Sequence, residues 1–300
     1  MARPLPAPPS YDPRRRFGAH MPIAGGLHNA LYRGREAGCD IIQIFTKSPQ
    51  QWKARELTDD DIEQFLAAQV ETGIPCVASH DTYLINPAAA DPALLARSRA
   101  ALREEMRRSA RLQIPFVVMH LGARGDAPDQ EALGRLAESV RDALNAVDGT
   151  PTLLLETTAG QGTTLGWRFE HLQAVLEAVA APSERLGVCI DSCHLFAAGY
   201  ELRDPEGYYG TMDALDATMG LARIRLIHAN DSQRERGSRV DRHMHIGQGY
   251  LGQKAFRLLL TDPRLQHVPV VLETPKEGDM DRVNLAVLRE LAQTDRETTA

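Results

Sequence analysis

Short apolar runs recur along the chain, and longer polar stretches separate them. Each run is about the length of a strand that is buried in a parallel sheet. Eight such runs occur: RFGAHM at 16–21, DIIQIFT at 40–46, PCVASHD at 75–81, PFVVMHLG at 115–122, TLLLETT at 152–158, LGVCIDSCH at 186–194, RLIHANDS at 225–232 and PVVLETP at 269–275.

The stretches between the runs have the spacing of amphipathic helices. Leu133, Leu136, Val140 and Leu144 step by three or four residues, and the segment from Phe169 to Val179 repeats this spacing. Eight strand–helix repeats predict an α/β protein with a single TIM (β/α)₈ barrel domain. A doubly wound open sheet remains an alternative, because the number of strands does not show that the sheet closes.

Two helix starts are marked by capping residues. Thr58 precedes three aspartates, 59–61, whose charge suits the positive end of a helix dipole. Asp204 precedes Pro205, which is favoured at the first position of a helix. Both signals predict that a helix begins directly after the capping residue.

The N-terminal segment, MARPLPAPPSYDPRRR, is rich in proline and has no apolar core of the kind found in secretory signals. We predict a flexible arm over residues 1–15 and the barrel domain over 16–296. No run of about 18 apolar residues occurs, so we predict no membrane helix. The four cysteines match no disulfide scaffold and are predicted to be reduced thiols.

Side chains that can bind metal end seven of the eight runs; the second run ends instead in Thr46 and Lys47. In a barrel, the C-terminal ends of the strands meet on one face. A single histidine there is more often a hydrogen-bonded core residue than a ligand. Glu156 and Glu273, however, each follow three apolar residues, and burying a carboxylate without a partner is costly. A shared cation explains all of these positions together.

The candidate ligands are imidazoles and carboxylates without thiolates, a set that suits Zn²⁺, Mn²⁺ or Fe²⁺. The Gly-rich segment VDRHMHIGQG at 240–249 adds two more. Nine ligands are too many for one ion and indicate two or three, with a bridging carboxylate, an arrangement that suits phosphoester hydrolysis. The nine are His80, His120, Glu156, Asp191, His194, His228, Asp241, His243 and Glu273. His20 also ends a strand, whereas His28, His171 and His267 do not and are predicted to be structural.

Several long blocks of the chain resemble the endonuclease IV family of apurinic/apyrimidinic (AP) endonucleases, over about residues 17 to 292. The blocks are GAHMPIAGGLHNA at 18–30, SHDTYLIN at 79–86, LLETTAGQGTTLG at 154–166, VCIDSCHLFAAGY at 188–200 and HANDSQRERGSRVDRHMHIGQG at 228–249. The resemblance implies a TIM barrel with three zinc ions per monomer, with Mn²⁺ possible at one of the sites.

The resemblance also distributes the nine ligands among the three ions. His80 and His120 would hold the first, with Glu156 bridging it to the second. Asp191, His228 and Glu273 would complete the second ion. His194, Asp241 and His243 would hold the third, while His245 is not a ligand in the family and is predicted to be structural or to support a ligand.

The implied reaction is hydrolysis of the phosphodiester on the 5′ side of an abasic site in double-stranded DNA, which leaves a 3′-hydroxyl and a 5′-deoxyribose phosphate. Coordination to a cation lowers the pKa of water from 15.7 towards about 7 and so supplies a hydroxide at neutral pH. Glu156 and Glu273 are the predicted catalytic residues, the first as the bridge and the second as the group that orients the hydroxide.

DNA contacts are implied at the rim of the barrel. Tyr83 and Leu84 match side chains that enter the duplex in the family, and the loop TKSPQQW at 46–52 matches a DNA-contacting loop. Arg239 and Arg242 are candidate phosphate contacts. Gln50 stands where some members have arginine, so it keeps hydrogen bonding but loses a charge.

The formal net charge of −6 by itself argues against a nucleic-acid partner. Three divalent ions would cancel that charge and leave a positive pocket that attracts phosphate. The charge is thus compatible with the partner that the resemblance implies, double-stranded DNA with abasic sites. We also predict no membrane association, a monomer, and a location in the bacterial cytosol or nucleoid.

Two alternatives remain at this point. A xylose-isomerase-like sugar isomerase or epimerase uses the same barrel, but with one or two ions and fewer ligands. The segment Asp241–His243 and a third ion distinguish the nuclease from it. A metal-dependent protein that binds DNA without cutting it is the other alternative, although every ligand position is filled.

Overall fold

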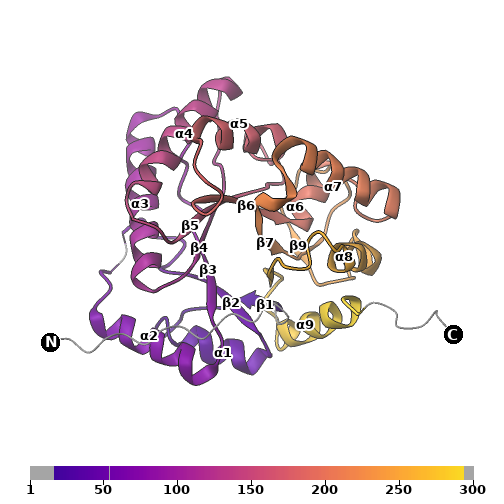
Figure 1. Cartoon of the computed structure of the whole chain (residues 1–300), viewed down its shortest axis with the longest axis horizontal. Coiled ribbons are helices and arrows are strands. Elements are labelled where there is room, and N and C mark those ends of the chain that lie inside the picture. Colours follow the sequence, from indigo (N-terminus) through magenta and orange to yellow (C-terminus); the bar gives the residue numbers. More distant parts are fainter. Residues whose placement is uncertain (1–16, 54, 294–300) are drawn as a thin grey trace.

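Eight parallel strands close into a barrel in the computed structural model, which describes residues 17–53 and 55–293 (Figure 1). Around the barrel the order is β1-β10-β7-β6-β5-β4-β3-β2. The strands are β1 (Phe17–His20), β2 (Ile41–Phe45), β3 (Cys76–His80), β4 (Phe116–Met119), β5 (Thr152–Glu156), β6 (Leu186–Asp191), β7 (Ile224–His228) and β10 (Val270–Leu272). Each of the eight predicted runs therefore contains a barrel strand, and the pairing of β1 with β10 excludes the open sheet.

Helices surround the barrel on its outside (Figure 1). They are α1 (Asn29–Ala37), α2 (Asp59–Thr72), α3 (Pro92–Arg111), α4 (Asp129–Leu144), α5 (Phe169–Val179), α6 (Ser192–Ala198), α7 (Pro205–Met219), the 3₁₀ turn η1 (Leu221–Arg223), α8 (Gly252–Thr261) and α9 (Met280–Leu291). Both predicted helix starts are confirmed. The Thr58 side chain accepts a hydrogen bond from the Asp61 amide in a capping box, and Asp204 caps α7 ahead of Pro205.

A short antiparallel hairpin is added to the loop after β7. It pairs β8 (Asp231–Ser232) with β9 (His243–Met244). Gly249 packs against the hairpin so closely that a Cβ would lie 2.3 Å from the carbonyl oxygen of Ser232. The hairpin folds the segment from 240 to 249 back over the C-terminal end of the barrel, although it is far from the other predicted ligands in sequence.

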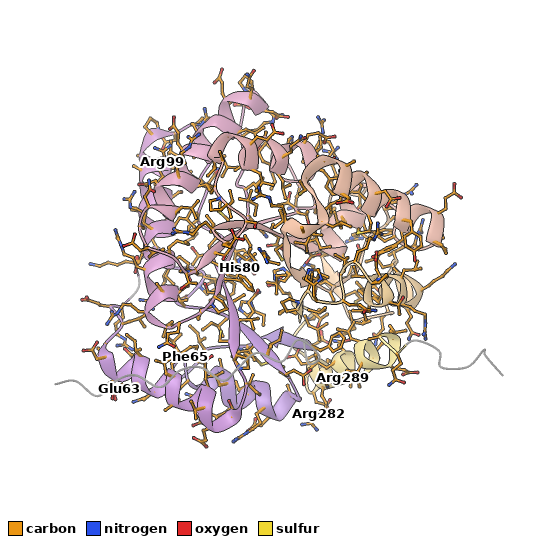
Figure 2. All side chains as sticks on the ribbon, in the orientation of Figure 1. Glu63, Phe65, His80, Arg99, Arg282 and Arg289 are labelled. Carbon is orange, nitrogen blue, oxygen red and sulfur yellow. The ribbon has the colours of Figure 1, made fainter. Side chains whose placement is uncertain are left out.

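Inside the barrel, an apolar layer of side chains is followed by a polar layer that lies nearer the C-terminal ends of the strands. Successive side chains of a strand point to opposite faces, so the second residue after an inward apolar residue points inward again. Leu154 and Leu226 are buried in the apolar layer, and Glu156 and His228 follow two residues later. His80 of the polar layer lies at the centre of the barrel, while Arg99 lies on the helical exterior (Figure 2). The apolar layer consists of Ile41, Val77, Ala78, Val118, Leu154, Cys189, Leu226 and Val271.

Other expectations concern the cysteines, the membrane and the chain ends. The four cysteines are free and buried. Among the helices of the described ranges, none is long and apolar enough to cross a bilayer. The predicted arm over 1–15 and both ends of the predicted domain, 16 and 296, lie outside the described residues.

Candidate metal centre

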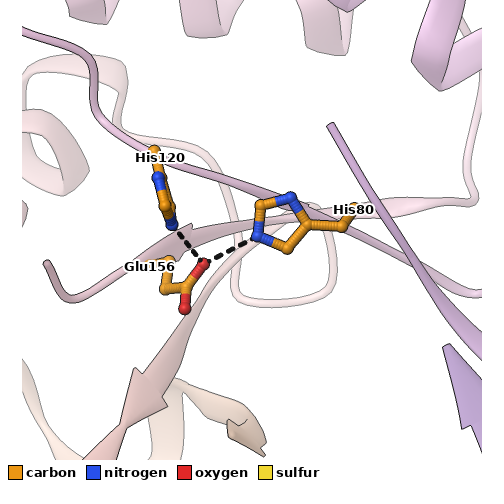
Figure 3. Close-up of side chains that lie close together, drawn as sticks. All are labelled: His80, His120 and Glu156. Carbon is orange, nitrogen blue, oxygen red and sulfur yellow. Dashed lines mark hydrogen bonds and ion pairs between the residues drawn. The ribbon is translucent and has the colours of Figure 1, made fainter. Parts of the chain in front are cut away.

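The first cluster joins the ends of three neighbouring strands. Glu156 at the end of β5 is fully buried, and its Oε2 lies 2.9 Å from Nε2 of His80 and 3.1 Å from Nε2 of His120 (Figure 3). His80 donates its Nδ1 hydrogen to the carbonyl oxygen of Asp81 at 2.8 Å. This hydrogen bond leaves Nε2 of His80 free to bind a cation beside Glu156.

The second cluster uses the other oxygen of the same carboxylate. Nδ1 of His228 lies 2.8 Å from Oε1 of Glu156, 3.3 Å from Oε2 of Glu273 and 4.0 Å from Oδ2 of Asp191. One ligand atom from each of these four residues lies within 4.8 Å of every other. Glu156 therefore faces two clusters at once, as a bridging ligand must.

The third cluster combines α6 with the hairpin. Nε2 of His194 and Nε2 of His243 lie 3.2 and 3.4 Å from Oδ1 of Asp241. His194 belongs to the first turn of α6, and not to a strand as the run LGVCIDSCH indicated. Asp191 caps this helix by accepting the amide hydrogen of His194 at 2.9 Å, so the second and third clusters are tied together.

The carboxylates of the first two clusters raise the pKa values of two histidines beside them. Burial by itself lowers the pKa of His80, but the hydrogen bond and charge of Glu156 outweigh burial and raise it to about 9. Burial likewise lowers the pKa of His228, and the charges of Glu273 and Glu156 raise it to about 9. For Glu156, burial raises the pKa, but His228 and His120 hold it well below the usual value. Carboxylates that attract protons this strongly would also attract metal cations.

Two ring nitrogens without a hydrogen-bond partner also indicate that the clusters bind metal. Nε2 of His194 and Nε2 of His243 are buried and have no hydrogen-bond partner among the described residues. A buried polar atom is costly without a partner, and both atoms face Asp241. The donor set is nitrogen and carboxylate oxygen, which suits zinc. The residues of all three clusters thus fit metal ions.

Comparison with known proteins shows the family of the chain. The family model of xylose isomerase-like TIM barrels matches residues 31–293. The probable endonuclease 4 of Chloroflexus aurantiacus is 49% identical over 281 residues, which cover 93% of this chain and 98% of that protein. The crystal structure of endonuclease IV from Thermus thermophilus superposes with a TM-score of 0.81 at 36% identity, covering 92% of this chain and 98% of that one.

The chain belongs to the endonuclease IV family. A D-tagatose 3-epimerase-like protein also superposes, with a TM-score of 0.72 over 92% of this chain and 96% of that chain, but it is only 17% identical. That likeness shows a shared barrel alone. The family membership that the sequence blocks predicted is therefore confirmed, and the sugar isomerase alternative is only a distant relation.

All nine predicted ligands of this endonuclease IV member lie in the three clusters. Their ring nitrogens and carboxylate oxygens converge from seven segments of the chain on the C-terminal end of the barrel. Their roles as ligands, and the catalytic roles of Glu156 and Glu273, stay predictions. His20 lies at the edge of the second cluster, with Nδ1 3.5 Å from Oε1 of Glu273.

Three of the residues predicted to contact DNA lie in loops that follow the C-terminal ends of β2 and β3. Tyr83 is 71% exposed and stands against Phe45, with 5.6 Å between the ring centroids. Leu84 beside it is half-buried, and Gln50 is exposed in the loop after β2. Their contacts with DNA stay predictions.

Two arginines were also predicted to contact phosphate. Both are exposed, and the guanidinium of Arg239 lies 3.7 Å from the ring centroid of Trp167. The Arg168 guanidinium lies 4.2 Å from the same ring. Arg242 donates to the carbonyl oxygen of the preceding residue. Stacking on Trp167 restrains the Arg239 guanidinium, and the phosphate contacts of both predicted arginines stay predictions.

Two residues that hold the ligands were not found from the sequence. Asn230 is fully buried; its Nδ2 donates to Oδ2 of Asp191 at 2.6 Å, and its Oδ1 accepts from the amide of Glu273 at 2.8 Å. Gln43, also fully buried, contacts both Glu273 and His228. A signal was present for each, because Gln43 interrupts the apolar run IIQIF and Asn230 follows His228 by two residues.

Two of the remaining histidines, His245 and His171, are buried and have partners at hydrogen-bond distance. His245 is buried, and its Nδ1 lies 3.0 Å from Nδ2 of Asn284. His171 lies within α5, and its Nδ1 accepts from the amide of Gly166 at 3.1 Å. His28 immediately precedes α1, and its predicted structural role stays a prediction.

Proposed function

We propose that this protein hydrolyses the phosphodiester on the 5′ side of an abasic site in double-stranded DNA and leaves a 3′-hydroxyl and a 5′-deoxyribose phosphate. The observation that carries the proposal is Glu156, whose two oxygens face separate clusters of ligands 2.8–3.1 Å away. A bridging carboxylate suits the clustered ions of phosphoester hydrolysis. Membership of the endonuclease IV family supports the same reaction.

We propose three Zn²⁺ ions, one at each of the three clusters, with Mn²⁺ possible at one of them. His80, His120 and Glu156 would hold one ion; Glu156, Asp191, His228 and Glu273 a second; and His194, Asp241 and His243 a third. Such ions, when bound, lower the pKa of water and neutralise charge on phosphate oxygens.

The chain's own residues would prepare the site for that chemistry. Glu273 is held by a hydrogen bond from Nε2 of Gln43 to its Oε1 at 2.6 Å, which leaves Oε2 directed at the second cluster. There it can accept a hydrogen bond from an attacking water and orient it towards phosphorus. Asp241 is half-buried beside His194 in the third cluster, where it would help to place the leaving oxygen.

The third cluster favours the nuclease over an epimerase. It requires the hairpin β8–β9, which carries His243 into the site, and the first turn of α6, which carries His194. An isomerase with one or two ions would have no use for these ligands. We also propose a monomer in the cytosol; the four free thiols support a reducing compartment.

A nicking assay tests the proposed function. An end-labelled duplex with one tetrahydrofuran abasic analogue should be cut once, on the 5′ side, and the upstream product should be extended by a polymerase because it ends in a 3′-hydroxyl. The intact duplex of the same sequence should stay uncut. Tight binding of the abasic duplex without any cut would favour the non-catalytic alternative, and epimerisation of D-tagatose without nicking would favour the sugar enzyme.

Replacing Tyr83 by alanine should weaken binding of the abasic duplex about 5- to 160-fold, because a base stacked on an aromatic ring contributes about 1–3 kcal/mol. The melting temperature should hardly change, since the side chain is 71% exposed. Fluorescence anisotropy with a labelled duplex gives the Kd. Tyr209→Ala, an exposed tyrosine of α7, is the matched control. Equal Kd values for Tyr83→Ala and the parent would exclude the contact.

A further inference from the structure

Gln43 is a buried amide in the middle of the polar layer of the barrel. It lies on β2, the strand that ends in Thr46 and Lys47 and not in a predicted ligand, and its side chain is fully buried. The register pairs it with His20 of β1. A buried amide requires partners for both its NH₂ group and its oxygen, so its contacts show what it holds in place.

Three contacts connect the amide to the second cluster. Nε2 of Gln43 donates to Oε1 of Glu273 at 2.6 Å and lies 3.1 Å from Nδ1 of His20. Oε1 of Gln43 lies 2.9 Å from Nε2 of His228. One side chain thus joins β2 to residues that follow it by 185 and 230 positions in the sequence.

The chemistry of these partners determines which way the amide points. An ionised carboxylate only accepts hydrogen bonds, so the NH₂ group must face Glu273. The amide oxygen then faces His228 and can only accept, so Nε2 of His228 must carry a hydrogen. In a neutral imidazole this leaves the lone pair on Nδ1, the atom that faces Glu156, Asp191 and Glu273.

We propose that Gln43 is a positioning residue for the metal site. Its amide oxygen keeps the proton of His228 on Nε2, and its NH₂ group holds Oε1 of Glu273 in a hydrogen bond. Nδ1 of His228 and Oε2 of Glu273 are then both directed at the same cation. The inference rests on the proposed function, because it assumes that the second cluster binds metal. His80, His194 and His243 have Nδ1 beside a backbone carbonyl, 2.8–3.1 Å away. His228 depends instead on a side chain, which a substitution can remove.

Loss of the amide should shift the proton of His228. With Gln43→Met, which keeps the length of the side chain, Nε2 of His228 loses its acceptor. The other tautomer, with the hydrogen on Nδ1, can still donate to Oε1 of Glu156 at 2.8 Å, and a proton there competes with a cation. Gln43→Glu keeps an acceptor for His228 but sets a carboxylate against Glu273. The two variants thus separate the two contacts.

The test uses zinc itself as the probe on the full-length protein. Zinc binding, measured by chelator competition, should weaken about 10- to 100-fold for one ion per monomer in Gln43→Met, the range typical of residues that support metal ligands. The value of kcat for nicking should fall in the same range, with little change in KM. In zinc-loaded protein labelled with ¹⁵N-histidine, the slowly exchanging Nε2 hydrogen of His228 should be visible in the parent and in Gln43→Glu and lost in Gln43→Met.

The matched control is Gln69→Met, which removes another buried glutamine amide. Gln69 accepts a hydrogen bond from the amide of Cys76 at the opposite end of β3, so Gln69→Met should affect stability and not zinc affinity.

A Gln43→Met protein that binds zinc like the parent and keeps the His228 signal would overturn the inference. If the parent protein binds no zinc or does not nick abasic DNA, the proposed function is overturned as well. If the parent is fully active and Gln43→Met has the same zinc affinity and kcat as the parent, only the role of Gln43 is overturned. Should Gln43→Met not fold, loss of the His228 signal in the zinc-loaded Gln43→Glu protein would contradict the inference, and its retention would support it.

Discussion

Replacing Glu156 by glutamine is expected to lower kcat for nicking of an abasic duplex by about 10³-fold, while the Kd for the same duplex changes less than about tenfold. Glutamine has nearly the same shape, so the barrel should still fold. It removes the negative charge that faces His80, His120 and His228, and it replaces one anionic oxygen by an NH₂ group that cannot bind a cation. Loss of one preorganised charged group in an active site typically costs about 10²–10³ in kcat.

Binding should survive because contacts to phosphate and sugar provide most protein–DNA hydrogen bonds and lie outside this carboxylate. Single-turnover nicking and fluorescence anisotropy measure the two quantities separately. Asp262→Asn is the matched control, since Asp262 is a buried carboxylate that accepts from Tyr208 and Arg264, residues outside the three clusters. It should lower the melting temperature and leave kcat within about twofold. Nicking by Glu156→Gln within tenfold of the parent would refute the bridging role.

Stripping the protein of metal should abolish nicking and make its stability depend on pH. Without cations, the neighbouring carboxylates outweigh burial and raise the pKa of His80 and that of His228 to about 9, so protons occupy both rings at neutral pH. A group whose pKa is higher in the folded state stabilises the fold most below its unfolded pKa of about 6.5. That contribution is lost as the pH rises from about 6.5 through about 9. The metal-free protein should therefore be less stable at pH 9 than at pH 6.5.

Metal binding should release the same protons. Because zinc binds neutral imidazole, adding zinc at pH 7.5 should displace about one proton each from His80 and His228. Isothermal titration in buffers of different ionisation enthalpy counts these protons, and thermal unfolding at the two pH values measures the change in stability. Reloading with zinc should restore nicking. Undiminished nicking by protein that elemental analysis shows to be metal-free would contradict the proposed mechanism.

Local patterns in the chain were sufficient for the strands, two helix starts and the polar layer. In a strand, residues two positions apart point to the same face, so Glu156 points the same way as Leu154, and His228 the same way as Leu226. In a closed barrel, the side chains at the ends of the runs therefore lie together at its C-terminal end. Capping chemistry placed the starts of α2 and α7, because it depends on residues next to one another. The resemblance to a family supplied the grouping of ligands by ion, which no spacing along the chain indicates.

Contacts between residues far apart needed the tertiary structure. Closure of the barrel depends on the pairing of β1 with β10, about 250 residues later, and no local pattern reports on it. His194 enters the site from a helix turn, where the alternation of a strand no longer applies. The sequence by itself determined which side chains could bind metal and that they follow buried strands, because residue type and periodicity are local properties. Only the tertiary structure decided that Glu156 divides its oxygens between two clusters and that Gln43 and Asn230 hold the ligands, because hydrogen bonds depend on where atoms meet in space.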